Sequence, residues 1–161
     1  MGKLNNTKEA QLEQNLIDLL CAQHGQWTFR SDLKTEEDLW NNLRNIIEIR
    51  NKSELNDNML TDSEFERIQS EILANTKTPF EAAKWLRGEK GKCSVVLERD
   101  NGLGRIELII YSNIEKNGGF SSYEIVHQIA KNKSNLEERS RRFDITLLIS
   151  GLPIIQIELK T

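Results

Sequence analysis

The sequence has little of what marks secreted, membrane or fibrous proteins. It contains two cysteines and two prolines among 161 residues. No apolar run approaches the roughly 20 residues that a membrane-spanning helix needs, and the first residues lack the apolar centre of a signal peptide. These absences exclude a disulfide scaffold and a membrane protein. We therefore expect a cytoplasmic protein in which Cys21 and Cys93 are free thiols.

Charge of one sign is also scarce. The net charge is -3, although 29% of the residues are charged and 37% are hydrophobic. This composition is typical of a folded globular protein, and the length suits one domain. A slightly acidic protein does not bind nucleic acid through its overall charge, so any DNA contact has to be local.

One local basic cluster lies between Gln128 and Phe143. Its cations are Lys131, Lys133, Arg139, Arg141 and Arg142. A charged run of this kind is either a solvated loop or a surface that contacts DNA phosphates. The sequence leaves both interpretations open.

Residues 1–90 are predicted to be mostly helical, because their apolar residues recur at helical spacing. Threonines stand where these helices are expected to begin, as N-caps: Thr7, Thr35, Thr61 and Thr78. The polar run over residues 52–60 predicts a loop, and Gly88 is expected to end the last helix.

Residues 91–161 change to the period of two that is typical of strands. Strands are predicted at 94–99, 105–112 and 123–129, with two more between 143 and 160. The step Asn101-Gly102 predicts a hairpin turn between the first two. Helices followed by strands indicate an α+β fold, with a mixed or antiparallel sheet flanked by N-terminal helices in one domain over 1–161.

Residues 141–160 carry the candidate chemistry and read as strand, tight turn, strand. Asp144 is the one acid of the first strand, and Glu158 and Lys160 alternate with aliphatic residues in the second. A hairpin brings these side chains together. Two nearby carboxylates repel unless a cation lies between them, and their hard oxygen atoms suit Mg²⁺. Lys160 can then orient a water and stabilise charge on a phosphate.

Spacing alone is a weak signal for this site. An exposed salt-bridge face on an ordinary hairpin would also contain Glu158 and Lys160. Asp144 is more informative, because an acid in an otherwise aliphatic strand is costly unless it is paired or bound to a metal. From the residues alone, metal-dependent phosphodiester hydrolysis and an exposed salt-bridge face therefore both stay open.

A metal site at this hairpin requires Asp144 and Glu158 to lie on the same face of the sheet. Directly opposed residues of an antiparallel pair lie on the same side of the sheet, so Asp144 has to pair with Glu158. A regular two- or four-residue turn would put them on opposite faces. We therefore expect an odd-length loop or a β-bulge near Gly151.

The run also resembles a known family. An R-x-D strand, an N-G-L-P-like turn and an I-E-L-K strand are motifs of PD-(D/E)xK nucleases, specifically of the N-terminal domain of type I restriction enzyme R subunits. Ser150 stands where that turn usually has Asn. The resemblance continues through the strand EIVHQ and, more loosely, to TPFEAAKWLR and the first helix.

The resemblance implies a restriction-endonuclease-like fold and an Mg²⁺-dependent endonuclease. It implies that Asp144 and Glu158 are metal ligands, that the Leu159 carbonyl completes the metal site, and that Lys160 is the catalytic lysine. An acid on the first helix often joins such sites, and Glu13 is the matching candidate.

Two positions keep more than one interpretation. Gln128 lies at a family-like position, although a strand glutamine is more often structural. The basic residues that follow it are the candidates for DNA contact. The DNA target sequence is not encoded here, because the resemblance assigns recognition to a separate specificity subunit.

The resemblance also implies partners. R subunits bind double-stranded DNA together with modification and specificity subunits, and they use ATP in motor domains. No G-x-x-x-x-G-K-[ST] motif occurs in this chain, so we expect ATP to bind downstream of Thr161. We also expect the chain to be a truncated fragment that folds alone but cuts DNA poorly. The alternatives are a PD-(D/E)xK nuclease without a motor and an inactive nuclease-fold docking module.

Overall fold

The computed structural model describes residues 2–22, 26–113, 121–129 and 144–159, with the backbone alone for residues 2–7. The chain divides into two compact units, one formed by Met1–Leu43 with Ser121–Thr161 and the other by Arg44–Phe120. Each unit has its own sheet. No helix in the described ranges is long and apolar enough to cross a membrane.

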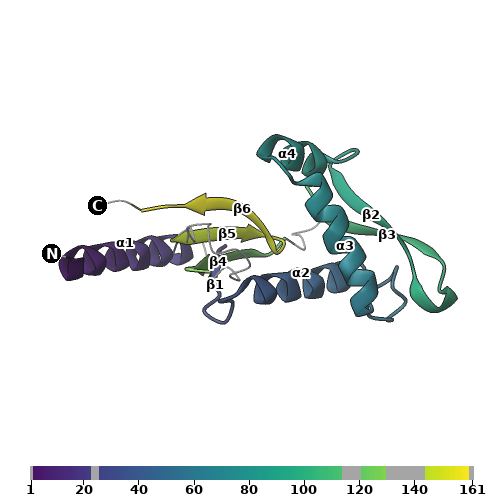
Figure 1. Ribbon diagram of the computed structural model, residues 1–161, viewed down its shortest axis with the longest axis horizontal. Coiled ribbons are helices and arrows are strands. Elements are labelled where there is room, and N and C mark those ends of the chain that lie inside the picture. The colour runs from purple at the N-terminus through teal and green to yellow at the C-terminus, as the bar shows by residue number, and fades with distance from the viewer. Residues whose placement is uncertain (1, 23–25, 114–120, 130–143, 160–161) are drawn as a thin grey trace. The chain divides into compact units, whose positions relative to one another are not determined.

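The first unit contains a four-stranded mixed sheet in the order β1-β4-β5-β6 (Figure 1). Its strands are β1 (Thr28–Phe29), β4 (Tyr123–His127), β5 (Ile145–Ile149) and β6 (Leu152–Ile157). β1 runs parallel to β4, and the other neighbours are antiparallel. The structure therefore confirms the α+β class and the mixed sheet.

Helix α1 (Gly2–Ala22) packs on one face of this sheet, alongside the strands in Figure 1. Its Ile17 contacts a buried cluster that contains Ile125, Ile145 and Leu147. The alternate residues Val126 and Leu148 belong to a second cluster. Odd-numbered residues of β4 and β5 therefore share the face that α1 covers, and even-numbered residues share the other.

The helix starts follow from local capping. Thr35 precedes α2 (Glu36–Arg50), and its hydroxyl accepts a hydrogen bond from the Asp38 N–H at 3.1 Å. Thr61 and Thr78 form complete capping boxes at α3 (Asp62–Asn75) and α4 (Pro79–Arg87). The prediction for Thr7 was wrong, because α1 already begins at Gly2.

Gly88 ends α4 as predicted, and its position requires glycine. Its φ is +52°, and a Cβ there would lie 1.8 Å from the carbonyl oxygen of Lys92. Any side chain would therefore push the turn away from the next strand.

The second unit is built around a hairpin of β2 (Lys92–Glu98) and β3 (Arg105–Ser112). The turn between them includes the short 3₁₀ helix η1 (Asp100–Gly102), in which Asn101 has a φ of +56°. α3 and α4 both contact β2. The hairpin forms a separate two-stranded sheet, so the strands predicted at 94–99 and 105–112 do not join the sheet that carries Asp144 and Glu158.

Both cysteines are free thiols, as expected. Cys93 is buried in the hairpin, and this burial, with a smaller contribution from the charge of Glu71, raises the pKa of its thiol to about 12. A thiol that stays protonated is a poor nucleophile and a poor metal ligand. Cys93 is therefore a core residue.

A buried ion pair connects α3 to the hairpin. The Glu64 carboxylate accepts hydrogen bonds from the Arg99 side chain and the Asp100 N–H, each at 2.7 Å. Burial raises the pKa of Glu64, but these bonds, one from Thr61 and the charge of Arg99 outweigh burial, so the pKa is lowered overall. The stabilisation is therefore full above the ordinary carboxyl pKa and is lost as the pH falls through the lowered value.

We expect Arg99→Leu to lower the free energy of unfolding by about 3–5 kcal/mol, because it leaves the buried Glu64 charge without its partner. Urea unfolding of this chain, followed by circular dichroism, measures the change. Arg67→Leu is the matched control, since Arg67 pairs with Asp100 at the surface, and such pairs contribute at most about 1 kcal/mol. Equal losses in the two variants would contradict the assignment.

Candidate functional site

The hairpin of β5 and β6 contains the predicted β-bulge. Next to the turn, Ile149 pairs with Leu152 and Leu148 with Pro153. The register then shifts between Leu147 and Leu148, so that Leu147 pairs with Ile155 and Ile154 is the extra residue. The shifted register continues to the pair of Ile145 and Ile157.

This shift decides which acids share a face. One residue beyond Ile145 and Ile157, the same register puts Asp144 across from Glu158. The turn has two central residues, Ser150 and Gly151, both with positive φ as a type I′ turn requires. Without the bulge this turn would pair Asp144 with Ile157 and direct Glu158 to the opposite face.

Asp144 is half-buried just before β5 and forms hydrogen bonds with residues that follow β4 and β6. Its carboxylate oxygen Oδ2 accepts a hydrogen bond from the N–H of Leu159 at 2.5 Å. Its backbone carbonyl accepts one from the N–H of Gln128 at 3.2 Å. The Asp144 carboxylate therefore holds the backbone at Leu159, the residue that follows Glu158.

Gln128 connects this strand end to α1. Its φ of +50° ends β4 two residues before the predicted boundary at 129. Its side-chain amide donates to Glu13, at 3.1 Å to Oε2 and 3.4 Å to Oε1. Hydrogen bonds therefore run from α1 through the ends of β4 and β5 to the residue that follows Glu158.

Glu13 is buried, with 7% of its surface exposed, and an uncharged amide is its one hydrogen-bond partner within the described residues. The buried Glu124 of β4 is different, because it pairs with Arg30 and accepts a hydrogen bond from Asn42 at 3.0 Å. A buried carboxylate without a cation is costly. Among the described residues of this unit, Glu13 is therefore the buried acid that has no cationic partner.

The remaining predicted site residues have different outcomes. Glu158 is exposed. In the ranges that the structure describes, no group of three or more Asp, Glu, His or Cys residues is close enough to hold a metal ion, so Glu13 is not gathered with Asp144 and Glu158. Six predicted residues lie outside the described residues: Lys131, Lys133, Arg139, Arg141, Arg142 and Lys160.

Sequence comparison identifies the family. The family described as "Type I restriction enzyme R protein N terminus" matches residues 6–161. The chain belongs to this family. The match includes α1 from residue 6 onward, the four-stranded sheet and the whole second unit.

Curated relatives include type I restriction enzyme endonuclease subunits. The one from Staphylococcus saprophyticus is 32% identical over 80% of this chain and 12% of its own length. Two from Staphylococcus aureus strains are 30% identical over 81% of this chain and 13% of their length. The chain thus spans about an eighth of the relatives that it matches.

Disulfide trapping tests the shifted register. We expect the pair Thr146→Cys and Gln156→Cys to form a cross-strand disulfide, because these residues are directly opposed and opposed Cα atoms lie within disulfide reach. The control pair, Thr146→Cys with Ile155→Cys, places the thiols on opposite faces. Both are made with Cys21→Ser and Cys93→Ala, and alkylation with mass spectrometry counts the free thiols. Oxidation of the control pair alone would show the unshifted register.

Proposed function

We propose that this chain is the metal-dependent DNA endonuclease domain of a type I restriction enzyme R subunit. The observation that carries the proposal is the bulged register of β5 and β6, because its continuation by one residue beyond the pair of Ile145 and Ile157 would bring Asp144 opposite Glu158. Membership of the R protein N-terminal family and relatives described as endonuclease subunits support it.

The donor set at this edge fits Mg²⁺. Asp144 and Glu158 provide hard carboxylate oxygens, which that ion prefers, and one Asp144 oxygen is held by the Leu159 N–H. We assign the Leu159 carbonyl to the same metal site. When bound, Mg²⁺ lowers the pKa of a coordinated water and offsets the charge that develops on the phosphate.

The chain's own groups then have separate roles. Asp144 fixes the backbone that carries Glu158 and Lys160, so one carboxylate orients the rest of the site. We assign to Lys160 the positioning of the attacking water and the stabilisation of negative charge in the transition state. Precise placement matters because loosely held groups lose much of their catalytic effect.

Glu13 and Gln128 extend the proposed site to α1. Gln128 holds the Glu13 carboxylate by its amide and the Asp144 carbonyl by its N–H. We propose that Gln128 is a positioning residue and that Glu13, which does not form one cluster with Asp144 and Glu158, contributes negative charge to the metal site through a water. The basic residues from Lys131 to Arg142 remain the proposed contacts to the substrate near this site.

The whole protein's activity follows from the same proposal. The R subunit would cut double-stranded DNA in a complex with modification and specificity subunits, while ATP-driven translocation belongs to parts beyond this chain. The relatives are about eight times longer than the matched segment, which leaves room for a motor.

We expect Asp144→Ala, Glu158→Ala and Lys160→Ala each to reduce DNA cleavage by the full-length enzyme at least about 100-fold. ATP hydrolysis should stay within about twofold, because no phosphate-binding loop occurs in this chain. Gln156→Ala is the matched control, since Gln156 is an exposed residue of β6 two positions before Glu158. Parallel loss of ATPase and cleavage in folded variants would argue against a dedicated nuclease site.

Gln128→Ala should raise the Mg²⁺ concentration for half-maximal cleavage by about 10-fold, because residues that hold metal ligands typically change metal affinity by 10–100-fold. Cleavage at saturating Mg²⁺ should change much less. Gln14→Ala is the control on α1, where Gln14 bonds the exposed Asp18. An unchanged Mg²⁺ dependence in Gln128→Ala would remove Gln128 and Glu13 from the site and leave Asp144 and Glu158 in place.

A further inference from the structure

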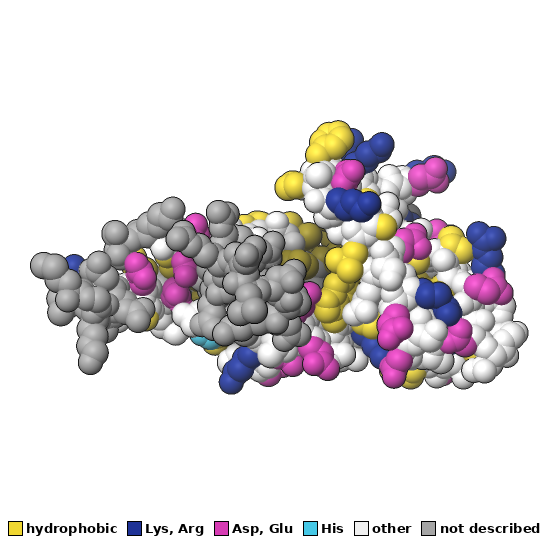
Figure 2. Space-filling model, in the orientation of Figure 1, with side chains coloured by type: hydrophobic (Ala, Val, Ile, Leu, Met, Phe, Trp, Pro, Cys, Tyr) yellow, Lys and Arg dark blue, Asp and Glu magenta, His cyan; other side chains and the backbone are white. Residues whose placement is uncertain are grey.

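Helix α4 of the second unit presents an aromatic ring and cations to solvent. Phe80 has 79% of its surface exposed, and no residue of the helix is fully buried. Lys84 and Arg87 follow Phe80 at helical spacing, so the three share one face, and Lys77 lies just before the extended N-cap residue Thr78. All four are exposed. Figure 2 shows hydrophobic and basic side chains gathered over α4.

The positively charged side chains of this surface have no bonding partner in the part of the protein that the structure describes. Within the described residues, Lys77, Lys84 and Arg87 form no ion pair and no side-chain hydrogen bond. Three other arginines of the same unit form ion pairs: Arg44 with Asp62, Arg67 with Asp100 and Arg99 with Glu64.

The nearest carboxylate on α4 is also occupied. Glu81 accepts hydrogen bonds from the N–H and the hydroxyl of Thr78, at 3.1 and 3.2 Å. It caps the helix, and no ion pair joins it to Lys84 or Arg87 within the described residues. The outer face of α4 therefore keeps its positive charge.

The helix dipole explains only part of this arrangement. Cations in the last turn, such as Lys84 and Arg87, stabilise a helix by about 0.3–1 kcal/mol. Lys77 lies before the N-terminus, where the dipole disfavours a cation. Phe80 gains nothing from the dipole, and its exposed ring offers apolar surface that a partner can cover.

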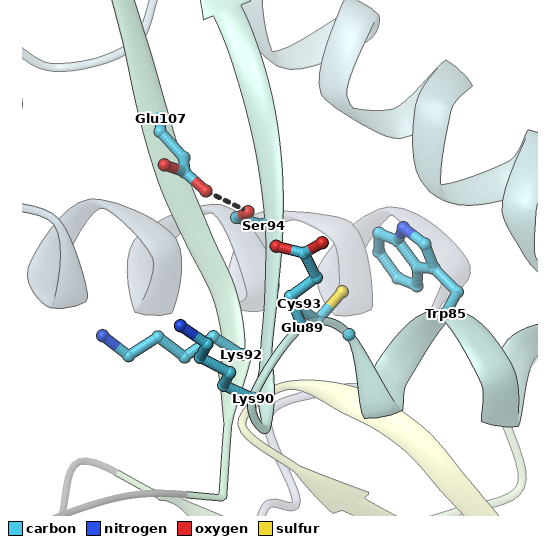
Figure 3. A pocket seen from close by; sticks show the side chains of 8 residues that line it. Trp85, Glu89, Lys90, Lys92, Cys93, Ser94 and Glu107 are labelled. Carbon is cyan, nitrogen blue, oxygen red and sulfur yellow. Dashed lines mark hydrogen bonds between the residues drawn. The ribbon is translucent and has the colours of Figure 1, made fainter.

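The turn after α4 adds further cations beside the helix. Lys90 and Gly91, with φ of +53° and +77°, form a tight turn closed by a 3.0 Å hydrogen bond from Lys92 N–H to the Glu89 carbonyl. In Figure 3 the side chains of Lys90 and Lys92 extend in the same direction from a hollow that Trp85 also lines. Glu89 and Glu107 also line this hollow, so we place the binding surface on the outer face of α4 instead.

We propose that Lys77, Phe80, Lys84 and Arg87, the α4 face, dock against the sugar-phosphate backbone of duplex DNA. The choice of DNA as the polyanion rests on the proposed function, and charge complementarity supports it. Each cation can neutralise a phosphate, and the Phe80 ring can pack on a deoxyribose. Such contacts position DNA without reading its sequence, which suits an enzyme part that is not expected to choose the target.

The test compares two triple variants of the full-length subunit with the same change of charge. One is Lys77→Gln, Lys84→Gln and Arg87→Gln. The matched control is Lys34→Gln, Lys52→Gln and Arg105→Gln, all exposed and outside α4. Glutamine retains helix propensity. Binding to a fluorescent 40-base-pair (about four helical turns) duplex is measured by anisotropy with EDTA, at several salt concentrations.

Loss of three phosphate contacts should reduce the slope of log affinity against log salt by about 2.7, or 0.9 for each contact. Relative to wild type, the variant's deficit in affinity should therefore shrink about 40-fold between 50 and 200 mM salt. The control should keep the wild-type slope. Equal slopes for both triple variants would overturn the proposal. Normal DNA binding together with weakened assembly with the modification and specificity subunits would also overturn it, because that result would identify a protein-docking face.

Phe80→Ala separates the apolar contact from charge. It should weaken DNA binding several-fold without changing the salt slope, while Leu73→Ala, at an exposed leucine of α3, should have no effect. Unchanged affinity in Phe80→Ala would remove the ring from the surface. Because binding is measured without cleavage, these results hold even if Asp144→Ala shows that the proposed nuclease site is wrong.

Discussion

The register of the β5–β6 hairpin is the constraint on which the candidate site depends. A two-residue turn pairs strands so that Asp144 and Glu158 would lie on opposite faces, and one extra residue, Ile154, reverses this. A β-bulge leaves its extra residue unpaired and disturbs the ladder locally. Such a cost is expected where the bulge directs a side chain that function needs, and here the redirected residue is an acid.

Hydrogen bonds also connect the ends of β4 and β5 to helix α1 in the first unit. Gln128 leaves β4 in a left-handed conformation and thereby contacts both Asp144 and Glu13. The two buried acids, Glu13 and Glu124, differ because Glu124 has Arg30 while Glu13 has a neutral amide. Because a buried acid without a cation is costly and Glu13 has no cationic partner among the described residues, we assign Glu13 to the proposed metal site.

Much of this architecture was predictable from local patterns. Capping boxes such as that of Thr61 are encoded within four residues, and the parity of the hairpin required a bulge. The place of the bulge was not predictable. Ile154 and Ile155 are both exposed aliphatic residues, so the sequence there does not alternate between buried and exposed side chains in a way that marks the extra residue. β1 is two residues long and exists through its pairing with β4. The contact of Gln128 with Glu13 joins residues 115 positions apart, so no short-range signal indicates it.

The central claim is that Asp144 and Glu158 form one metal site, and a Mn²⁺ soak of crystals of the full-length subunit tests it most directly. Anomalous diffraction locates the ion without relying on activity. The account predicts a peak within coordination distance, about 2.0–2.3 Å, of carboxylate oxygens from both residues. Ordered side chains of both residues with no peak between them, or a peak bound elsewhere in the first unit, would contradict it.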